Sequence, residues 1–338
     1  MSLTGAVAFC GSSEVDGMKL AFEEAEAAGT LGDSKFDLRT FDDASTAEGA
    51  VGAFQQAVAA KPAAILGVCF SPVAQAIAPA IDDSKIPFIV TNASGANVTE
   101  PAYAYRSAVP QFEYAGRTIE VLGARGIKKV AIIFQRDNQG VVDILNNSMK
   151  PKLRDLGITV AAEEGVTAET QDFSPQISSI RRDKPDAVGV LAAGGANVTI
   201  MTQLRQAGIN VPVFGQAAMA GSYYIKTGGD AVDGTIYAVN FDPSLQHPSS
   251  QAFRSAFVKK YNREPDFTAA GGYDAARMLI EAIKEAGSTD HAAIKKALDD
   301  LEGFDGAQGP LTLTDQGDTE GSGIVVEVRG GKTVPVEE

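Results

Sequence analysis

The chain has 338 residues, which suggests about two domains at roughly 150 residues per domain. Apolar residues make up 44% and charged residues 21%, a composition typical of folded globular protein rather than of long disordered segments. The net charge is −14, with no basic run and no apolar stretch of the ~18–20 residues that cross a bilayer, which argues against nucleic-acid binding, anionic-lipid binding and membrane spanning.

Short apolar runs alternate with amphipathic stretches in the first third of the chain. This alternation is typical of βαβ units around a parallel sheet. Apolar residues at helical spacing end at Gly29, a natural helix C-cap, and a strand-like alternation follows. The predicted elements are a helix over 17–28, a strand over 36–41, a helix over 46–60, and strands over 63–68 and 86–90.

A second series resembles the first in order and spacing, and amphipathic helices and two strand-like segments follow it. Because the two series match, we expect an α/β protein with two doubly wound, Rossmann-like lobes. The predicted elements are strands over 130–134, 158–162, 187–191 and 211–214, with helices over 141–156, 175–182 and 198–207, then helices over 249–261, 268–286 and 290–301, then strands over 309–313 and 323–328.

Residues 107–111 and 237–243 have the character of junctions between the two lobes. We predict a first lobe of residues 1–109 and 243–312 and a second lobe of residues 110–242 and 313–338, with a ligand cleft between them. A chain that crosses between lobes more than once makes a hinge of several strands, which permits closure but restricts its direction.

Motifs for catalysis, metal binding and nucleotide binding are missing from the sequence. It has no P-loop and no dinucleotide-binding glycine pattern after a strand. Two cysteines do not make a tetrahedral zinc site without other ligands, and no histidine lies near enough to Ser71 to act as its base. We therefore expect no enzyme activity, no metal and no cofactor.

An ordered set of short segments along nearly the whole chain resembles the periplasmic substrate-binding proteins of the leucine/isoleucine/valine type. Each segment is weak evidence alone, but their order is specific. The segments are Leu3-Thr4-Gly5, Phe41-Asp42-Asp43-Ala44-Ser45, Gly67-Val68-Cys69-Phe70-Ser71, Ile86-Pro87-Phe88-Ile89, Tyr105-Arg106-Ser107, Asp137-Asn138-Gln139-Gly140, Gly272-Tyr273-Asp274-Ala275 and Gly331-Lys332-Thr333-Val334-Pro335-Val336.

The resemblance implies a type I periplasmic binding fold and a monomeric receptor that delivers a small carboxylate solute to an ABC permease in the membrane. A ligand-sensing regulatory module of the same fold is the alternative, and a Rossmann-like enzyme is a more distant one. The chain shows no secretory signal, because residues 1–3 run directly into Thr4-Gly5. Since a mature chain starts in this way, we still expect a periplasmic or extracytoplasmic location.

The resemblance also implies a strand before Leu-Thr-Gly that is central in its sheet. Here residues 5–9 would have to supply that strand, or the sequence lacks upstream residues, or the gap is repaired in an unusual way. Losing a central strand would leave two ladders unpaired, at a cost above the ~5–15 kcal/mol by which a domain is stable.

In the first lobe, Ser71 follows a strand and precedes a helix opened by Pro72. A hydroxyl at a helix N-terminus suits an anionic oxygen, although Ser71 could simply cap the helix. The resemblance favours contact with the ligand carboxylate, and it adds Ala93 and Ser94 from the next loop, where an ordinary turn is the alternative. Phe9 and Cys10 are expected in the wall of the cleft.

In the second lobe and hinge, the positions that would hold an amino acid's ammonium carry no acid. By the resemblance these positions are Gln111, Ala196 and Ala217, with Gln139 in place of a tyrosine, and Gln216 lies beside them. A buried ammonium without an anionic partner costs several kcal/mol. The solute is therefore expected to be a branched-chain or apolar amino acid held by another acid, or an amine-free carboxylate such as an aromatic acid, unless these glutamines only face solvent.

Cys10 and Cys69 follow strands that would be neighbours in a doubly wound sheet. Their two sulfurs could therefore lie within bridging distance, but two buried thiols are favoured over a disulfide.

Overall fold

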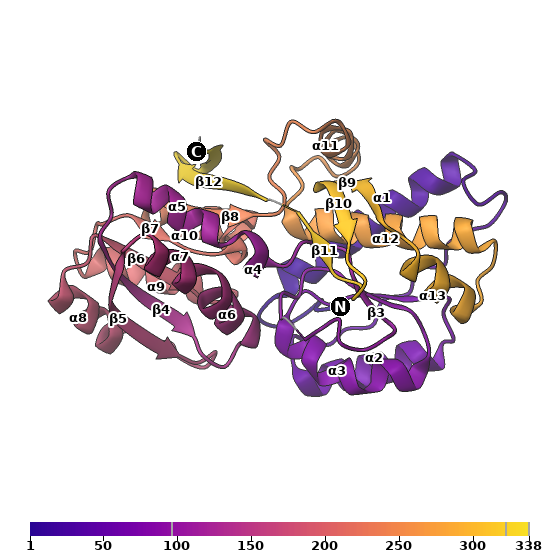
Figure 1. The fold of residues 1–338 in the computed structure, drawn as a ribbon, viewed down its shortest axis with the longest axis horizontal. Helices are drawn as coiled ribbons and strands as arrows, with labels where there is room; N and C mark the ends of the chain where they lie inside the picture. Colours follow the sequence, from indigo (N-terminus) through magenta and orange to yellow (C-terminus); the bar gives the residue numbers. More distant parts are fainter. Residues whose placement is uncertain (96, 322, 337–338) are drawn as a thin grey trace. The chain divides into compact units, whose positions relative to one another are not determined.

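The computed structural model describes residues 1–95, 97–321 and 323–336, and it divides into two compact units (Figure 1). Unit 1 comprises Met1–Pro110 and Leu245–Gly321, and unit 2 comprises Gln111–Ser244 and Ser322–Glu338. Residues 313–321, which the sequence prediction gave to the second lobe, belong to unit 1. Of that predicted segment, residues 322, 337 and 338 lie outside the described residues.

Unit 1 contains a parallel sheet in the order β1-β2-β3, formed by Ile65–Gly67, Phe88–Val90 and Ala104–Arg106. Two helices, α2 (Ala47–Ala59) and α3 (Ser71–Ser84), lie side by side along this sheet (Figure 1). Phe54 of α2 and Ile77 of α3 join Phe88 of β2 in one apolar cluster. Burial of this cluster fixes the two helices on one face of the sheet.

Two long helices, α1 (Ala8–Ala27) and α12 (Phe267–Ala286), pack against each other in unit 1. A Cβ added at Gly17 would lie 2.0 Å from the carbonyl oxygen of Ala269, and one at Gly272 would lie 2.2 Å from that of Glu14. Only glycine allows this approach of the two backbones.

Residues 5–9 are not a strand, which rules out that source for the missing central strand. The helix α1 begins at Ala8, nine residues before the helix predicted over 17–28. Val7, the N-cap residue of α1, is buried, whereas Ala8 and Phe9 are half-buried in its first turn. Sequence alternation over so short a run does not separate strand from helix.

The remaining elements of unit 1 are two helices and a small antiparallel sheet in the order β11-β10-β9. The hairpin of β10 and β11 joins residues 313–321 to this sheet, which is why they belong to unit 1. These elements are α11 (Pro248–Tyr261), α13 (His291–Asp299), β9 (Gly303–Gly306), β10 (Gly309–Leu313) and β11 (Thr319–Glu320).

Unit 2 is built on a seven-stranded sheet. Five strands are parallel, and two further strands extend the sheet in antiparallel fashion beyond β8. In sheet order the strands are β13 (Lys332–Pro335), β12 (Ile324–Arg329), β8 (Thr235–Val239), β7 (Val213–Phe214), β6 (Ala187–Leu191), β4 (Lys129–Gln135) and β5 (Thr159–Val166).

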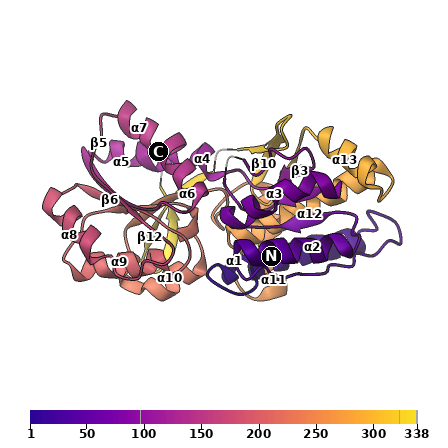
Figure 2. The same cartoon turned by 90° about the horizontal axis from the view of Figure 1, so that it is seen from below.

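Helices cover both faces of this larger sheet, as Figure 2 shows for unit 2. The helices α8, α9 and α10 lie on one face, and α5 and α7 lie on the other. The bounds are α4 (Gln111–Tyr114), α5 (Gly116–Ala124), α6 (Gln139–Asp143), a π-helical turn (Ile144–Met149), α7 (Lys150–Asp155), α8 (Ser174–Asp183), α9 (Ala196–Gln206), a 3₁₀ turn (Ala217–Met219), α10 (Ser222–Gly228) and a second 3₁₀ turn (Gly229–Val232).

The strand predicted over 36–41 is extended but belongs to no sheet. Its side chains alternate between half-buried and exposed over 36–39, as in a strand, yet no neighbouring strand pairs with the run among the described residues. Within the described part of the chain, no helix is both long and apolar enough to cross a bilayer.

Candidate functional site

Ser71 lies at the first position of α3, immediately after the strand β1 and its short loop. Pro72 follows it in the first turn, and the Ser71 hydroxyl accepts a hydrogen bond of 3.1 Å from the N–H of Gly95. A serine hydroxyl can donate one hydrogen bond as well as accept, so this contact leaves its proton available. The structure thus brings together the two loops at the carboxyl ends of β1 and β2.

The loop after β2 carries Ala93 and Ser94, both buried. The N–H of Ala93 donates to the carbonyl oxygen of Val68, at 3.2 Å, and the Ser94 hydroxyl lies 3.5 Å from the carbonyl oxygen of Asn92. The main-chain donor of Ala93 is therefore already used within the protein. Sequence reasoning did not distinguish these two residues.

Two buried ionic side chains hold this loop in place. Glu14 of α1 accepts hydrogen bonds from the side chains of Thr91 and Asn92, and Arg106 of β3 donates to the carbonyl oxygen of Gly95, at 2.8 Å. Burial raises the pKa of Glu14 to about 7, although both hydrogen bonds act to lower that pKa. The sequence gave no sign of Glu14, because its partners lie almost eighty residues along the chain.

Cys10 and Cys69 form a disulfide, so the expectation of two buried thiols is wrong. The bond connects α1 to the loop between β1 and α3, two residues before Ser71, and Phe9 precedes it in the first turn of α1. Both sulfurs and a Glu14 carboxylate oxygen lie within 4.8 Å of one another, but the disulfide removes the thiolates that a metal would need.

In unit 2, Gln111 and Ala217 are in direct contact. The side-chain oxygen of Gln111, at the start of α4, accepts a hydrogen bond of 3.0 Å from the N–H of Ala217. Gln216 is buried and donates to the carbonyl oxygen of Ala192, at 2.8 Å, just after β6. These contacts bring Gln111, Gln216 and Ala217 together at the carboxyl ends of β6 and β7.

Ala196 and Gln139 begin two other helices of unit 2. Ala196 is the first residue of α9, after the loop that leaves β6. Gln139 is the first residue of α6, where it is exposed and donates to Asp143 one turn later, at 2.7 Å. Both follow the carboxyl ends of strands, but no described contact joins Gln139 to the group formed by Gln111, Gln216 and Ala217.

Sequence reasoning missed two buried amides beside this group. Asn197 accepts a hydrogen bond from the N–H of Ala192, at 3.1 Å, and Gln135 accepts one from the N–H of Ala193, at 3.2 Å. Gln135 ends the strand β4, so the rule that ligands lie at the carboxyl ends of parallel strands could have found it. Asn197 lies within a helix, where no pattern indicated it.

Residues 1–332 match the family described as periplasmic binding protein. The chain belongs to the periplasmic binding protein family. It is 27% identical to Leu/Ile/Val-binding protein homolog 3 of Brucella melitensis biotype 1, over 94% of this chain and 86% of that protein. This confirms the family predicted from the sequence.

Two solved structures place the fold among proteins of the same kind. A leucine binding protein from Thermotoga maritima is 26% identical, has a TM-score of 0.92 and covers 99% of this chain and 96% of that one. A solute binding protein of an ABC transporter from R. palustris, in complex with benzoate, is 22% identical with a TM-score of 0.88, over 99% and 93% of the two chains. The predicted α/β fold is confirmed, and the family is one of binding proteins.

Proposed function

We propose that this protein is an extracytoplasmic receptor of an ABC importer that binds a small carboxylate solute and performs no chemistry on it. Both units contribute to the site in this proposal, and closure of the hinge encloses the solute and creates the form that docks on the permease. The receptor acts as a monomer, without a metal or cofactor. The relatives described above, whose names include a leucine binding protein and a benzoate complex, support this class of solute.

The arrangement of Ser71 carries the proposal. Its hydroxyl accepts a hydrogen bond from the N–H of Gly95 and lies at the N-terminus of a fourteen-residue helix, whose dipole favours negative charge. Pro72 supplies no N–H of its own, so the donors offered to an anion are the Ser71 hydroxyl and main-chain N–H, together with the hydroxyl of Ser94. A carboxylate has two oxygens that accept such bonds, and bonds to ionised groups are the stronger kind.

The other end of the solute is proposed to be neutral or anionic rather than an ammonium. Gln111 and Gln216 are amides, each engaged with the main chain of unit 2, and Ala196 and Ala217 offer only main-chain groups and apolar surface. An ammonium placed among these residues would be desolvated without a counter-ion. An amine-free acid such as an aromatic carboxylate is therefore favoured over leucine.

Calorimetric titration of benzoate, 4-hydroxybenzoate and leucine tests both parts of the proposal. We expect an aromatic acid to bind with micromolar affinity, about −8 kcal/mol, and leucine to bind more weakly. Ser71→Ala should weaken the best solute by more than about 1 kcal/mol, roughly fivefold.

Ser84→Ala is the matched control, because Ser84 lies at the other end of the same helix and makes only local bonds. If Ser71→Ala binds as tightly as Ser84→Ala, the assignment of the carboxylate to Ser71 is wrong. If leucine binds more tightly than every amine-free acid, the assignment of the solute class is wrong.

A further inference from the structure

The loop between β1 and α3 contains a residue in a rarely populated backbone conformation. Val68 has a φ of +76°, in the left-handed region that β-branched residues almost never adopt. Such a residue persists only where the surrounding structure holds it. Val68 lies three residues before Ser71, so the contacts that hold Val68 also position the Ser71 hydroxyl.

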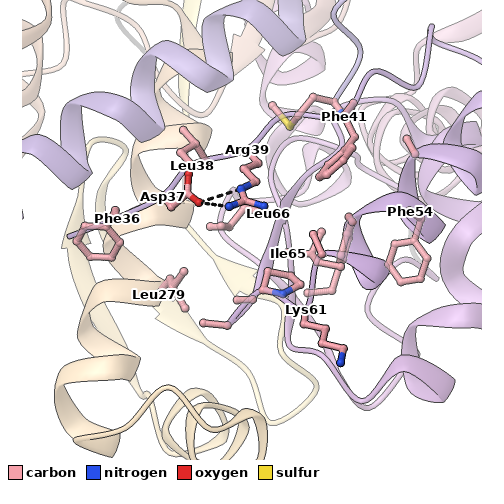
Figure 3. Close-up of a pocket in the computed structure, with 18 of the residues that line it drawn as sticks. Phe36, Asp37, Leu38, Arg39, Phe41, Phe54, Lys61, Ile65, Leu66 and Leu279 are labelled. Atoms are coloured by element: carbon pink, nitrogen blue, oxygen red, sulfur yellow. Dashed lines mark hydrogen bonds and ion pairs between the residues drawn. The ribbon is translucent and has the colours of Figure 1, made fainter. Parts of the chain in front are cut away.

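The strand before this loop is fixed by its neighbours. Residues Ile65–Gly67 pair with Phe88–Val90 of β2 along their whole length. Figure 3 shows Ile65 and Leu66 beside an apolar pocket that Phe54 of α2 also lines. A change in the backbone of Val68 therefore falls on the loop and the first turn of α3 rather than on the strand.

Two kinds of contact hold Val68 and its loop in this conformation. The carbonyl oxygen of Val68 accepts hydrogen bonds from the N–H groups of Asn92 and Ala93, at 3.3 and 3.2 Å. The next residue, Cys69, is bonded to Cys10 of α1. The disulfide is the covalent contact, and a change in redox state removes it.

A carboxylic acid lies beside this disulfide. Glu14 follows Cys10 by one turn of α1, and a carboxylate oxygen of Glu14 lies within 4.8 Å of both sulfurs. One oxygen of Glu14 accepts hydrogen bonds from Thr91 and Asn92, and the other has no hydrogen-bond partner among the described residues. Glu14 is fully buried, which places an acid in the same water-poor surroundings as Cys10.

The two sulfurs differ in the properties that decide how a disulfide is opened. Cys69 is half-buried, whereas Cys10 is only 4% exposed, so an external thiol reaches Cys69. Cys10 lies in the first turn of a twenty-residue helix, whose dipole stabilises a thiolate there. Because a stabilised thiolate is the better leaving group, attack at Cys69 with departure of Cys10 is favoured on both counts.

We propose that Cys10 and Cys69 form a redox-active disulfide that a dithiol reduces, with Glu14 as the acid, and that the reduced chain binds its solute more weakly. The weaker binding rests on the function proposed above, because it concerns the solute held by Ser71. Without the covalent bond, hydrogen bonds alone hold Val68, which is then free to return to a negative φ. The loop that carries Ser71 thereby loses its position relative to Gly95.

The exchange balances with one dithiol for each disulfide. A thiolate of the dithiol attacks the sulfur of Cys69, which forms a mixed disulfide and breaks the bond to Cys10. Glu14 gives its proton to the departing Cys10 thiolate and takes another from solvent. The second thiol of the reductant then attacks its partner's sulfur in the mixed disulfide and releases Cys69. The dithiol leaves as a disulfide, having passed two electrons and two protons to the pair.

The protonation of Glu14 gives this step its pH dependence. Burial raises the pKa of Glu14 to about 7, so the acid is present below pH 7 and is lost above it. The hydrogen bonds from Thr91 and Asn92 and the ammonium of Met1 act to lower this pKa, and the carboxylate of Asp43 acts to raise it. These groups are unchanged in the variants compared below.

The rate of reduction by dithiothreitol tests the role of Glu14. The oxidised chain is mixed with the reagent between pH 6 and pH 8, its free thiols are alkylated and counted by mass spectrometry, and each rate is divided by the thiolate fraction of the reagent. We expect Glu14→Gln to slow reduction at pH 6 by about tenfold or more. The normalised rate of the parent chain should fall above pH 7, and that of Glu14→Gln should not. A loss of stability would instead speed reduction, because it exposes the bond.

Glu23→Gln is the matched control, because Glu23 lies on the same helix and its exposed carboxylate pairs with Lys260. Equal rates of reduction in Glu14→Gln and Glu23→Gln would overturn the proposal. So would a folded chain whose disulfide dithiothreitol does not open.

Hydrogen exchange and calorimetry test the effect on the loop and on the solute. In the reduced, folded chain we expect the Ala93 amide to exchange about tenfold faster, and the Kd of the tightest aromatic acid to rise about tenfold. The double variant Cys10→Ser with Cys69→Ser should bind like the reduced chain and should not respond to dithiothreitol.

Equal exchange at Ala93 and equal affinity in the oxidised and reduced chains would overturn the link between the disulfide and the solute. If no carboxylate binds the oxidised chain, the function proposed above fails and the solute half of this proposal fails with it. The reduction rates and the exchange at Ala93 then still decide whether the disulfide is redox-active and whether it holds the loop.

Discussion

Glu14 is buried without a cationic side chain, beside the loop that carries Ser94. Its hydrogen bonds with Thr91 and Asn92 use one carboxylate oxygen, and the other has no hydrogen-bond partner among the described residues. The ammonium of Met1 favours ionisation of Glu14, and the carboxylate of Asp43 opposes it. Desolvation outweighs the favourable contacts and raises the pKa of Glu14 to about 7.

This raised pKa makes the stability of unit 1 depend on pH. The pKa of Glu14 is about 7 in the folded chain against an ordinary value of 4.5 for glutamate, so between these values the folded state holds more protons than the unfolded state. The contribution of Glu14 is therefore complete below about pH 4.5 and is lost as the pH rises through 7. Glu14→Gln should flatten the fall in unfolding free energy between pH 5 and pH 8, measured by urea denaturation.

Asp274 provides the comparison, because burial also raises its pKa to about 7. Both of its oxygens accept hydrogen bonds, from the N–H groups of Ala307 and Gln308 and from the Gln308 side chain. In Asp274→Asn an NH₂ group replaces one of these two accepting oxygens, and an NH₂ group cannot accept a hydrogen bond. Asp274→Asn should therefore destabilise the chain at every pH. If the unfolding free energy of Glu14→Gln falls between pH 5 and pH 8 as steeply as that of the parent chain, Glu14 does not titrate in this range.

At the scale of the elements, two charged side chains connect the loop after β2, which carries Ser94, to neighbouring elements. Arg106 of β3 is fully buried, pairs with Asp318 of the β10–β11 turn at 2.9 Å, and donates to the carbonyl of Gly95. Asp318 also accepts a hydrogen bond from Thr99, at 3.0 Å. One ion pair thus joins the central sheet, the small antiparallel sheet and the loop that carries Ser94.

Asp318→Ala should lower the unfolding free energy by about 3 kcal/mol, because it removes a carboxylate that pairs with the buried guanidinium of Arg106. Asp318→Asn keeps an acceptor of similar shape and should cost less. Urea denaturation of the two variants gives the comparison. Equal and small losses of unfolding free energy in Asp318→Ala and Asp318→Asn would mean that Arg106 pairs with another group or is hydrated.

The disulfide between Cys10 and Cys69 closes a loop of about sixty residues. Removing it with Cys69→Ser should cost about 2–4 kcal/mol, since the unfolded chain regains the freedom of that loop. Thermal denaturation of the parent chain with and without a reductant provides the same measurement without a substitution. A variant as stable as the oxidised parent would contradict the expected role of this bond.

Local patterns predicted most elements of the fold, and the failures have physical causes. Residues 187–191 form a strand as predicted, because four buried apolar residues within five positions, between a polar segment and a glycine-containing loop, favour a buried strand. The run over 36–41 has the pattern of a strand but no partner, and pairing is not encoded locally. The segment predicted as a junction over 237–243 overlaps the last three residues of the strand β8, because those residues lead directly into polar sequence.

The sequence likewise indicated some features of the candidate site and not others. Ser71 and Ser94 could be found because the carboxyl ends of parallel strands can be located from the pattern. The disulfide and the Glu14 contacts depend on distances between segments about sixty to eighty residues apart, which spacing alone does not give. The hydrogen bond from the N–H of Ala93 to the carbonyl oxygen of Val68 likewise forms only in the folded loop, so the sequence does not indicate it.

At the scale of the whole molecule, the strands of each unit pair only within that unit, so the two units need not unfold together. We expect calorimetry of the solute-free chain to show two transitions. The lower one should belong to unit 1, whose parallel sheet has three strands and an open edge at β1, against seven strands in unit 2. Reduction of the disulfide should lower that transition only.

The solute then tests whether both units bind it. A ligand stabilises whatever part of the chain must be folded to bind it. An aromatic acid held by Ser71 and also by Gln111 or its neighbours should raise both transitions and bring them together. A solute held by unit 1 alone would raise only the lower transition, which would contradict the proposed two-unit site while leaving the role of Ser71 intact. A single transition before any solute is added would instead show that the two units already unfold as one.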